Sequence, residues 1–447
     1  MSVVKEGRAT LALAVPLMAG QVSQMLMAVV DTKMIGEIGT LELAASGFAN
    51  NVLQVPLLIT AGLTVAVSIK TSQARGAGTP EKARNGLRNG MYLAFALGVM
   101  TLLSAWWILP HLDVFRQDPD VTRRVPGYFM LVALSLIPAF MVMTLKSHTD
   151  ALNRPWMPMI IVVGSVFLNV FLNWLLIQGN WGFPALGLEG AGLATCAARL
   201  ASLGGLLWWV SEDRSLERWI PRTWFRGVDW KEAKSLIILA APAALQIGAE
   251  FGAFIAAALV VGSMGEVALA AHQVAFTFSA TIYMIPLGLS MALTVRTGEA
   301  WGAGQRERLG KIMLSAWVIV LGISLLSMAG LILANEALAE FFVAEGEWET
   351  VALAAAIFTV AAIFQVGDQS QITFSGFLRG LDDVAVPAGI MVFCYWVAGV
   401  PLGWWLAYQV GMGAVGIWWG LTTGLWLTAL GLGFRVWLRL RKEKKTG

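Results

Sequence analysis

The chain has 447 residues, of which 57% are hydrophobic and only 13% are charged, with a formal net charge of +3. Such a composition excludes a soluble globular protein. The net charge says little by itself. Cys196 and Cys394 both lie in apolar runs, so we expect neither a structural disulfide nor a cysteine metal site.

Twelve apolar runs dominate the sequence, and a membrane-spanning helix needs roughly 20 such residues. The runs cover approximately residues 10–34, 46–70, 90–110, 126–146, 157–178, 188–210, 235–263, 272–297, 312–334, 351–378, 386–409 and 413–437. We therefore predict an all-α polytopic membrane protein with twelve transmembrane helices and no room for an extramembrane domain. The first run is expected to be a full span and not a cleaved signal, because no small-x-small site follows it.

Basic residues concentrate on alternate loops. If both termini are cytoplasmic, 26 of the 31 Lys and Arg residues fall at the cytoplasmic ends of the spans. The loop 335–349 has no base and is expected outside; its acidic residues are Glu336, Glu340, Glu345, Glu347 and Glu349. We expect the basic tail 439–445 to anchor the chain on the cytoplasmic membrane surface and not to bind nucleic acid.

The second half of the chain repeats the first at an offset of 226 residues. Gly36–Gly78 aligned with Gly262–Gly304 gives 15 identities in 43 positions without a gap, and Pro16 aligns with Pro242. We therefore expect two pseudo-symmetric six-helix lobes, related by an axis along the membrane normal, with the substrate path between them. The predicted parts are an N-lobe over 1–210, a cytoplasmic linker over 211–234 and a C-lobe over 235–447.

Three acidic residues interrupt the apolar runs, namely Asp31, Glu250 and Asp368. An ionised side chain at the bilayer centre costs at least about 2.5–3.5 kcal/mol, so such groups usually face a cavity and act there. None of the three has an acidic counterpart at the aligned position of the other half. The simplest interpretation is a carrier of cations or protons, with these acids as candidate Na+ ligands.

In the N-lobe, Asn169 and Asn173 are four residues apart in the fifth span and therefore share a helical face. With Asp31 and the hydroxyl of Thr195 they would form an oxygen-rich site with one negative charge. Such hard ligands suit a small cation, while the carboxylate alone suffices for a proton. The alternative is that the asparagines only bridge helices through hydrogen bonds.

In the C-lobe, Gln246 and Glu250 share a helical face four residues apart. Two acids in one cavity can bind Na+ or an organic cation, or can share a proton. The alternative is that each acid pairs with a buried base, for which Arg199 is the only candidate deep in a span. Further candidates for lining a substrate cavity are Gln24, Met27, Phe364 and Gln371.

These stretches resemble the multidrug and toxic compound extrusion (MATE) transporters of the bacterial NorM type. The matching segments are Val30–Gly36, Glu250 with Ala270–Val274, and Asp368 with Gly376–Gly380, and the resemblance extends over essentially the whole chain. It implies two six-helix lobes arranged as a V. It also implies export of cationic, aromatic drugs in exchange for Na+ or H+ by alternating access.

The resemblance also implies roles for residues of the N-lobe. Asp31 matches the acid that the family has there, and Asn169, Asn173 and Thr195 match positions that accompany it in cation binding. Many members of the family have an aspartate in place of Asn173, so the local negative charge is lower in this chain.

For the C-lobe, Glu250 and Asp368 match the acids of the NorM-type branch, which the DinF-type branch generally lacks. We further expect a multi-pass protein of the bacterial cytoplasmic membrane that acts as a monomer. It is expected to need no cofactor beyond the coupling ion and to bind no nucleic acid.

Two other functions compete with drug export. A lipid-linked oligosaccharide flippase of the same superfamily should have an arginine-lined cavity for an anionic headgroup, whereas this chain has three acids and one deep arginine. An intramembrane aspartyl protease of the Gly-x-Gly-Asp kind is unsupported, because Gln365-Val-Gly-Asp368 lacks the first glycine. No metalloprotease, nucleophile-elbow or P-loop motif occurs, so we expect no enzyme.

Overall fold

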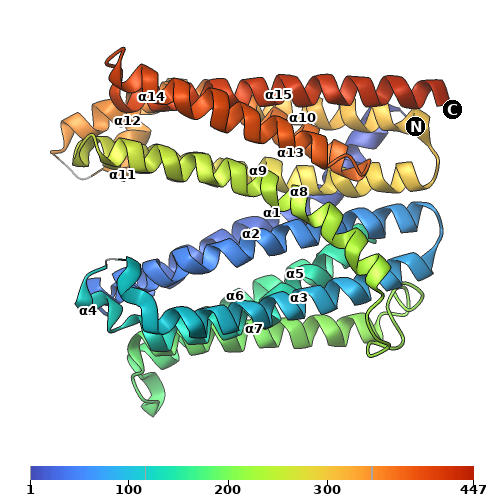
Figure 1. Cartoon of the computed structure of the whole chain (residues 1–447), viewed down its shortest axis with the longest axis horizontal. Helices are drawn as coiled ribbons and strands as arrows, with labels where there is room; N and C mark the ends of the chain where they lie inside the picture. Colours follow the sequence, from blue (N-terminus) through green and yellow to red (C-terminus); the bar gives the residue numbers. More distant parts are fainter. Residues whose placement is uncertain (1, 116, 344–345, 447) are drawn as a thin grey trace. The chain divides into compact units, whose positions relative to one another are not determined.

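The computed structural model describes residues 2–115, 117–343 and 346–446, and it contains no strand among them (Figure 1). Twelve helical segments are long and apolar enough to cross a membrane, which confirms the all-α, twelve-span prediction. In chain order, the helices are α1 (Val3–Gly36), α2 (Thr40–Gly76), α3 (Pro80–Ile108), α4 (Pro119–Thr122), α5 (Val125–Ala151), α6 (Trp156–Gln178), α7 (Gly187–Glu212), α8 (Trp230–Gly262), α9 (Glu266–Gly302), α10 (Arg306–Leu333), α11 (Asn335–Phe342), α12 (Trp348–Gly380), α13 (Ala385–Val392), α14 (Val400–Tyr408) and α15 (Gly413–Thr446). A π-helical turn, Phe393–Gly399, joins α13 and α14 into one span.

The helices follow the repeat predicted from the sequence. Helices α2 and α9 each contain 37 residues and begin and end 226 positions apart. The turn after each of them contains a glycine with positive φ, Gly78 at 65° and Gly304 at 70°. A residue with a Cβ is strained in that conformation, so the coincident glycines reflect a conserved turn geometry between the halves.

The chain divides into two compact units whose boundaries differ from the predicted ones. Unit 2 is Ala19–Ala244, and unit 1 combines Met1–Met18 with Leu245–Gly447. The start of α1 therefore belongs with the second half of the chain, and the linker and the start of α8 belong with the first half. Each boundary falls two residues after a proline inside a helix, Pro16 in α1 and Pro242 in α8. A sequence repeat identifies equivalent segments, but it does not say which unit each segment packs against.

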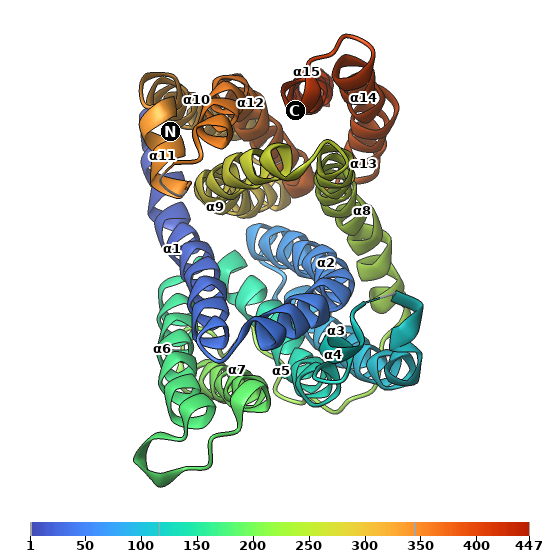
Figure 2. The ribbon, with the colours of Figure 1, turned by 90° about the vertical axis from the view of Figure 1, so that its left-hand side faces the viewer.

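Helix α5 forms the centre of unit 2, where it packs against α2, α3 and α7 (Figure 2). Its buried side chains Phe129, Leu136 and Phe140 supply much of the core. Close approach of α3 depends on Gly98, because a Cβ there would lie 2.7 Å from the Cα of Ile137. Helix α6 packs mainly against α7.

Helix α12, the span equivalent to α5, forms the centre of unit 1 and packs against α9, α10 and α15. A Cβ at Gly376 would lie 2.4 Å from the Ser290 hydroxyl oxygen of α9, so only glycine permits this approach. Ser290 Oγ donates to the Ile372 carbonyl at 2.7 Å, and Thr294 Oγ1 donates to the Gly376 carbonyl at 2.9 Å. Small residues and hydroxyl hydrogen bonds are the usual means of joining helices in membranes.

A buried cluster of ion pairs lies at one end of unit 1. The carboxylate of Glu6, which is 0% exposed, accepts hydrogen bonds from Arg296 and Arg308. Arg306 next to them pairs with Glu443 of α15 at 3.3 Å. These contacts bring the start of α1, the α9–α10 turn and the end of α15 to the same end of unit 1 (Figure 1).

Glu6→Gln should destabilise the protein strongly, because it leaves two arginines without the charge that they surround. Breaking a buried pair by removing one partner costs about 3–5 kcal/mol. The measurement is thermal unfolding in detergent followed by tryptophan fluorescence. Glu217→Gln is the matched control, because it breaks an exposed pair with Arg222, and such pairs contribute at most about 1 kcal/mol. Equal Tm values for the two variants would contradict a structural role for Glu6.

Candidate functional site

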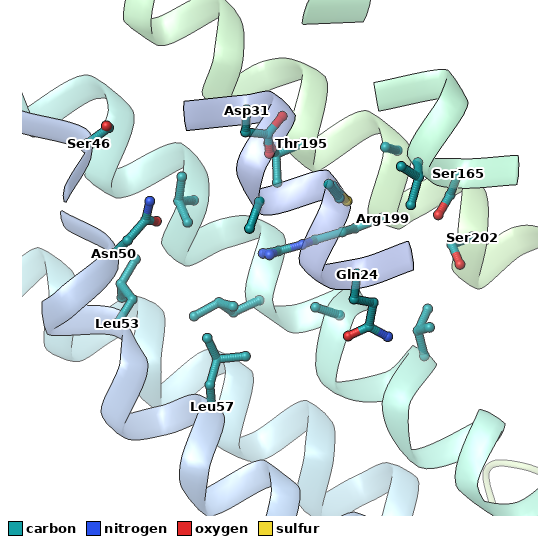
Figure 3. A pocket seen from close by; sticks show the side chains of 18 of the residues that line it. Gln24, Asp31, Ser46, Asn50, Leu53, Leu57, Ser165, Thr195, Arg199 and Ser202 are labelled. Atoms are coloured by element: carbon teal, nitrogen blue, oxygen red, sulfur yellow. The ribbon is translucent and has the colours of Figure 1, made fainter. Parts of the chain in front are cut away.

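Unit 2 contains a cavity of about 370 Å³ between α1, α2, α5, α6 and α7 (Figure 3). Gln24, Met27 and Asp31 of α1 lie on its wall, so the two predicted cavity candidates of the N-lobe are on the cavity surface. Thr195 and Arg199 line it from α7. The remaining polar lining comes from Thr32, Ser46, Asn50, Gln54, Tyr128, Ser165 and Ser202.

The four predicted N-lobe residues form one hydrogen-bonded chain at this cavity. Asn173 Nδ2 donates to Asp31 Oδ1 at 2.5 Å and to Asn169 Oδ1 at 3.2 Å. Asn169 Nδ2 donates in turn to Thr195 Oγ1 at 3.4 Å. The i,i+4 spacing on α6 places both amides on the face that meets α1 and α7, as the sequence predicted. Both asparagines are 0% exposed.

One oxygen of this chain, Asn173 Oδ1, is buried and accepts no hydrogen bond among the described residues. A buried acceptor without a donor is unfavourable unless a proton or a cation satisfies it. The amide nitrogen and oxygen exchange places by a 180° rotation, so Asn173 can direct either atom at Asp31. The donor set therefore fits a proton shared at Asp31 or a small monovalent cation.

Arg199 lies in the same cavity, one helical turn after Thr195. Its Nη1 donates to Ser135 Oγ at 2.7 Å, and its charge interacts with the Asp31 carboxylate. The N-lobe cavity therefore contains one acid and one base on opposite helices, α1 and α7. The sequence identified Arg199 as a deep base but did not place it beside Asp31.

In unit 1, Glu250 and Asp368 lie close to each other. Gln371 Nε2 donates to Glu250 Oε2 at 3.4 Å, and Tyr395 Oη donates to Gln371 Oε1 at 2.9 Å. Asp368 Oδ1 is buried and accepts no hydrogen bond among the described residues.

Gln246, predicted as part of the C-lobe site, makes hydrogen bonds to several residues of unit 1. Its Oε1 accepts hydrogen bonds from Ser375 Oγ at 3.1 Å and from Nε and Nη2 of Arg379 at 3.2 and 3.0 Å. Its Nε2 donates to the Val384 carbonyl at 3.0 Å. Both polar atoms of the Gln246 side chain therefore have protein partners, and Gln246 holds Arg379 in position. The charge of Arg379 interacts with Glu250.

The sequence analysis named Arg199 as the only candidate base deep in a span, but three bases near helix ends are buried as well. Lys146, Arg296 and Arg379 are also buried. They lie near the ends of helices α5, α9 and α12, respectively. Each of these helices continues past the apolar run from which it was predicted. Lys146 pairs with buried Asp150 at 2.6 Å, and their i,i+4 spacing was a signal that the sequence analysis missed.

Phe364 lies in aromatic packing and is 2% exposed. Its ring centroid is 5.8 Å from that of Phe254 and 5.7 Å from that of Trp418. Trp418 Nε1 donates to His272 Nδ1 at 3.2 Å. Among the residues that the structure describes, no three His, Cys, Asp or Glu side chains are grouped as a metal site. The candidate ion sites are therefore the Asp31 chain and the Glu250–Asp368 pair.

Comparison with known proteins identifies the family. The MatE family model matches residues 16–175 and 242–405, which are equivalent segments of the two halves. The chain belongs to the MatE family. A probable multidrug resistance protein NorM of Bradyrhizobium diazoefficiens is 34% identical over 436 residues, covering 96% of this chain and 93% of that protein. The multidrug resistance protein PmpM of Pseudomonas aeruginosa is 31% identical over 438 residues, covering 95% and 90%.

Solved structures of MatE-family transporters have the same fold. A variant of the MATE transporter VcmN of Vibrio cholerae superposes with a TM-score of 0.88 and 21% sequence identity, covering 100% of this chain and 98% of that one. The resemblance stated from the sequence is thereby confirmed, and with it a multi-pass membrane transporter and not an enzyme.

Asn173→Asp tests whether the Asp31 chain is a cation site. A second carboxylate beside Asp31 should make Na+ binding at least about tenfold tighter, because like charges in a partly buried site are relieved by a cation. Na+ binding to the purified protein is measured by calorimetry. Asn50→Asp is the matched control, since it adds the same charge elsewhere on the cavity wall. Equal effects of the two variants would mean that Asn173 only contributes to the packing of helices.

Proposed function

We propose that this protein is a secondary active exporter of cationic and aromatic organic compounds. Export is driven by the inward movement of H+ or Na+ in an alternating-access cycle. The relatives named for multidrug resistance support this assignment. The single observation that carries it is the Asp31 carboxylate in a cavity of small-molecule size, hydrogen-bonded to a buried amide.

A proton at Asp31 is the better-supported coupling ion of the N-lobe. Arg199 already supplies a positive charge near Asp31, and Asn173 supplies no second negative charge. A Na+ ion would therefore meet a site with little net negative charge, whereas a proton needs only the carboxylate. Protonation would release the amide of Asn173 and change the contact between α1 and α6.

The Glu250–Asp368 pair is proposed as a second charged site. Two neighbouring acids that held one proton between them would have one net negative charge, which suits a cationic drug or a Na+ ion that displaces the proton. Arg379, which is hydrogen-bonded to Gln246, lies beside this pair, and its charge is expected to keep Glu250 in place. Glu250 and Asp368 thus give unit 1 a cation preference that the cavity of unit 2 lacks.

The flippase alternative receives less support. An anionic lipid headgroup calls for several bases in the cavity, whereas the N-lobe cavity has Arg199 opposite Asp31. The named relatives also point to drug resistance.

The proposed location is the bacterial cytoplasmic membrane, with both termini in the cytoplasm. The concentration of bases at one set of helix ends supports this orientation.

A cysteine-labelling experiment tests the orientation. Glu345, in the middle of the acidic loop, lies outside the described residues, so we place the cysteine at Glu347, which is exposed. In a background without Cys196 and Cys394, Glu347→Cys should react with an impermeant thiol reagent in intact cells. Phe225→Cys in the linker, a position 96% exposed, should react only after lysis. The reverse labelling pattern would overturn both the orientation and the direction of export.

Asp31→Asn tests the coupling role directly, because the amide preserves the volume and removes the charge and its titration. Gradient-driven drug uptake into inverted vesicles should be abolished under an imposed pH gradient, while expression and Tm stay near wild type. Asp118→Asn in an exposed loop is the matched control and should export normally. Full efflux by Asp31→Asn would exclude the N-lobe mechanism.

Glu250→Gln and Asp368→Asn test the second site. Each should weaken binding of a cationic drug to the purified protein, because the site loses its negative charge. If the acids only stabilise packing, the drug affinity of each folded molecule would stay at the wild-type value.

A further inference from the structure

Arg199 extends into the N-lobe cavity between Asp31, Asn50 and Gln24 (Figure 3). Its guanidinium group has five N–H donors, and Ser135 Oγ accepts from Nη1 at 2.7 Å. The side chain is half-buried, so the rest of the guanidinium group is accessible from the cavity. A fixed positive charge with free donors is therefore available to a bound molecule.

This charge is not needed to complete the Asp31 chain. Asp31 already accepts a hydrogen bond from Asn173 on α6, and no salt bridge joins Arg199 to it among the described residues. The two opposite charges stand on different helices, and both line the cavity. Such a cavity is complementary to a molecule that itself has both charges.

We propose that Arg199 binds an acidic group of the substrate, so that the N-lobe cavity prefers zwitterions over simple cations. The preferred substrate has a carboxylate that meets Arg199 and a cationic centre that meets Asp31. This inference rests on the proposed function and names the substrate class of the same cavity. A planar guanidinium group is the side chain best suited to bind a carboxylate through two parallel hydrogen bonds.

The remaining walls fit the body of such a molecule. Apolar side chains also line this cavity, among them Met27, Leu53, Leu57, Val132 and Leu136. A cavity of about 370 Å³ is near the lower limit for small-molecule pockets, which favours a compact aromatic body. The neutral polar groups of Gln24, Asn50 and Gln54 can accept or donate to heteroatoms on its edge.

The competing explanation is that Arg199 only balances the charge of Asp31. In that case the acidic group of a ligand has no partner, and removing Arg199 changes the affinity for every cation by the same factor. The two explanations therefore differ in the ratio of affinities for a zwitterion and for its uncharged-acid analogue.

The test uses a xanthylium dye that has a free carboxylate and the methyl ester of the same dye, which is a simple cation. Binding of each to the purified protein in detergent is measured by fluorescence anisotropy. The wild type should bind the acid more tightly than the ester. In Arg199→Gln this preference should fall by about ten- to a hundredfold, the range of a charge-assisted hydrogen bond. Arg199→Lys keeps the charge and should retain an intermediate preference.

Arg123→Gln is the matched control, because it removes an exposed arginine outside the cavity and should leave the ratio at the wild-type value. An unchanged ratio in Arg199→Gln would overturn the proposal, and so would equal weakening or strengthening of both dyes. If Arg199→Gln does not fold, Arg199→Lys decides, since full retention of the ratio by an ammonium group contradicts two-point recognition of the carboxylate.

Binding in detergent requires no gradient, so this test is independent of coupling. If proteoliposomes export neither dye under a pH or Na+ gradient, the proposed function fails even where the binding ratio supports Arg199. If the ester is exported but the ratio does not depend on Arg199, only the substrate class fails.

Discussion

Every charged or polar group inside this chain must find its partner within the protein, because a lipid interior offers no water. Most of the buried charges meet this requirement with a direct partner. Glu6 accepts from two arginines, Lys146 pairs with Asp150, and Asp383 pairs with two arginines of α15. These clusters lie near the ends of helices and join neighbouring segments. They explain how the chain tolerates charge but give no route for an ion.

The acids of the two candidate sites differ from these clusters because none of them forms a salt bridge among the described residues. Asn173 Oδ1 and Asp368 Oδ1 are also buried acceptors without donors there, as is Asp150 Oδ1 of the Lys146 pair. An acid without a base is costly in a medium of low dielectric constant, so we infer that a ligand or a proton supplies the missing partner. The units have nevertheless diverged from their common repeat. Unit 2 has an acid and a base facing one cavity, while unit 1 has two neighbouring acids and a buried arginine.

Much of this arrangement was predictable from spacing within single helices. Four-residue spacing placed Asn169 and Asn173 on one face, and the long apolar runs predicted the twelve spans. Contacts between helices were less accessible, because they depend on the rotation of each helix and on where it ends. Arg379 was missed as a buried base because α12 extends past its apolar run, and Gln246 was assigned as a ligand although Arg379 occupies its oxygen. Phe364 is of a type that often lines cavities, but its ring packs against the rings of Phe254 and Trp418.

The exchange of segments between the halves has a consequence for how the protein is made. Glu6 leaves the ribosome before its partner Arg296, which follows 290 residues later. Until α9 has been synthesised and inserted, the start of α1 lacks this partner and the surface of unit 1 on which it packs. Unit 2 can assemble its own interior earlier, whereas unit 1 is completed only when its later helices join the start of α1.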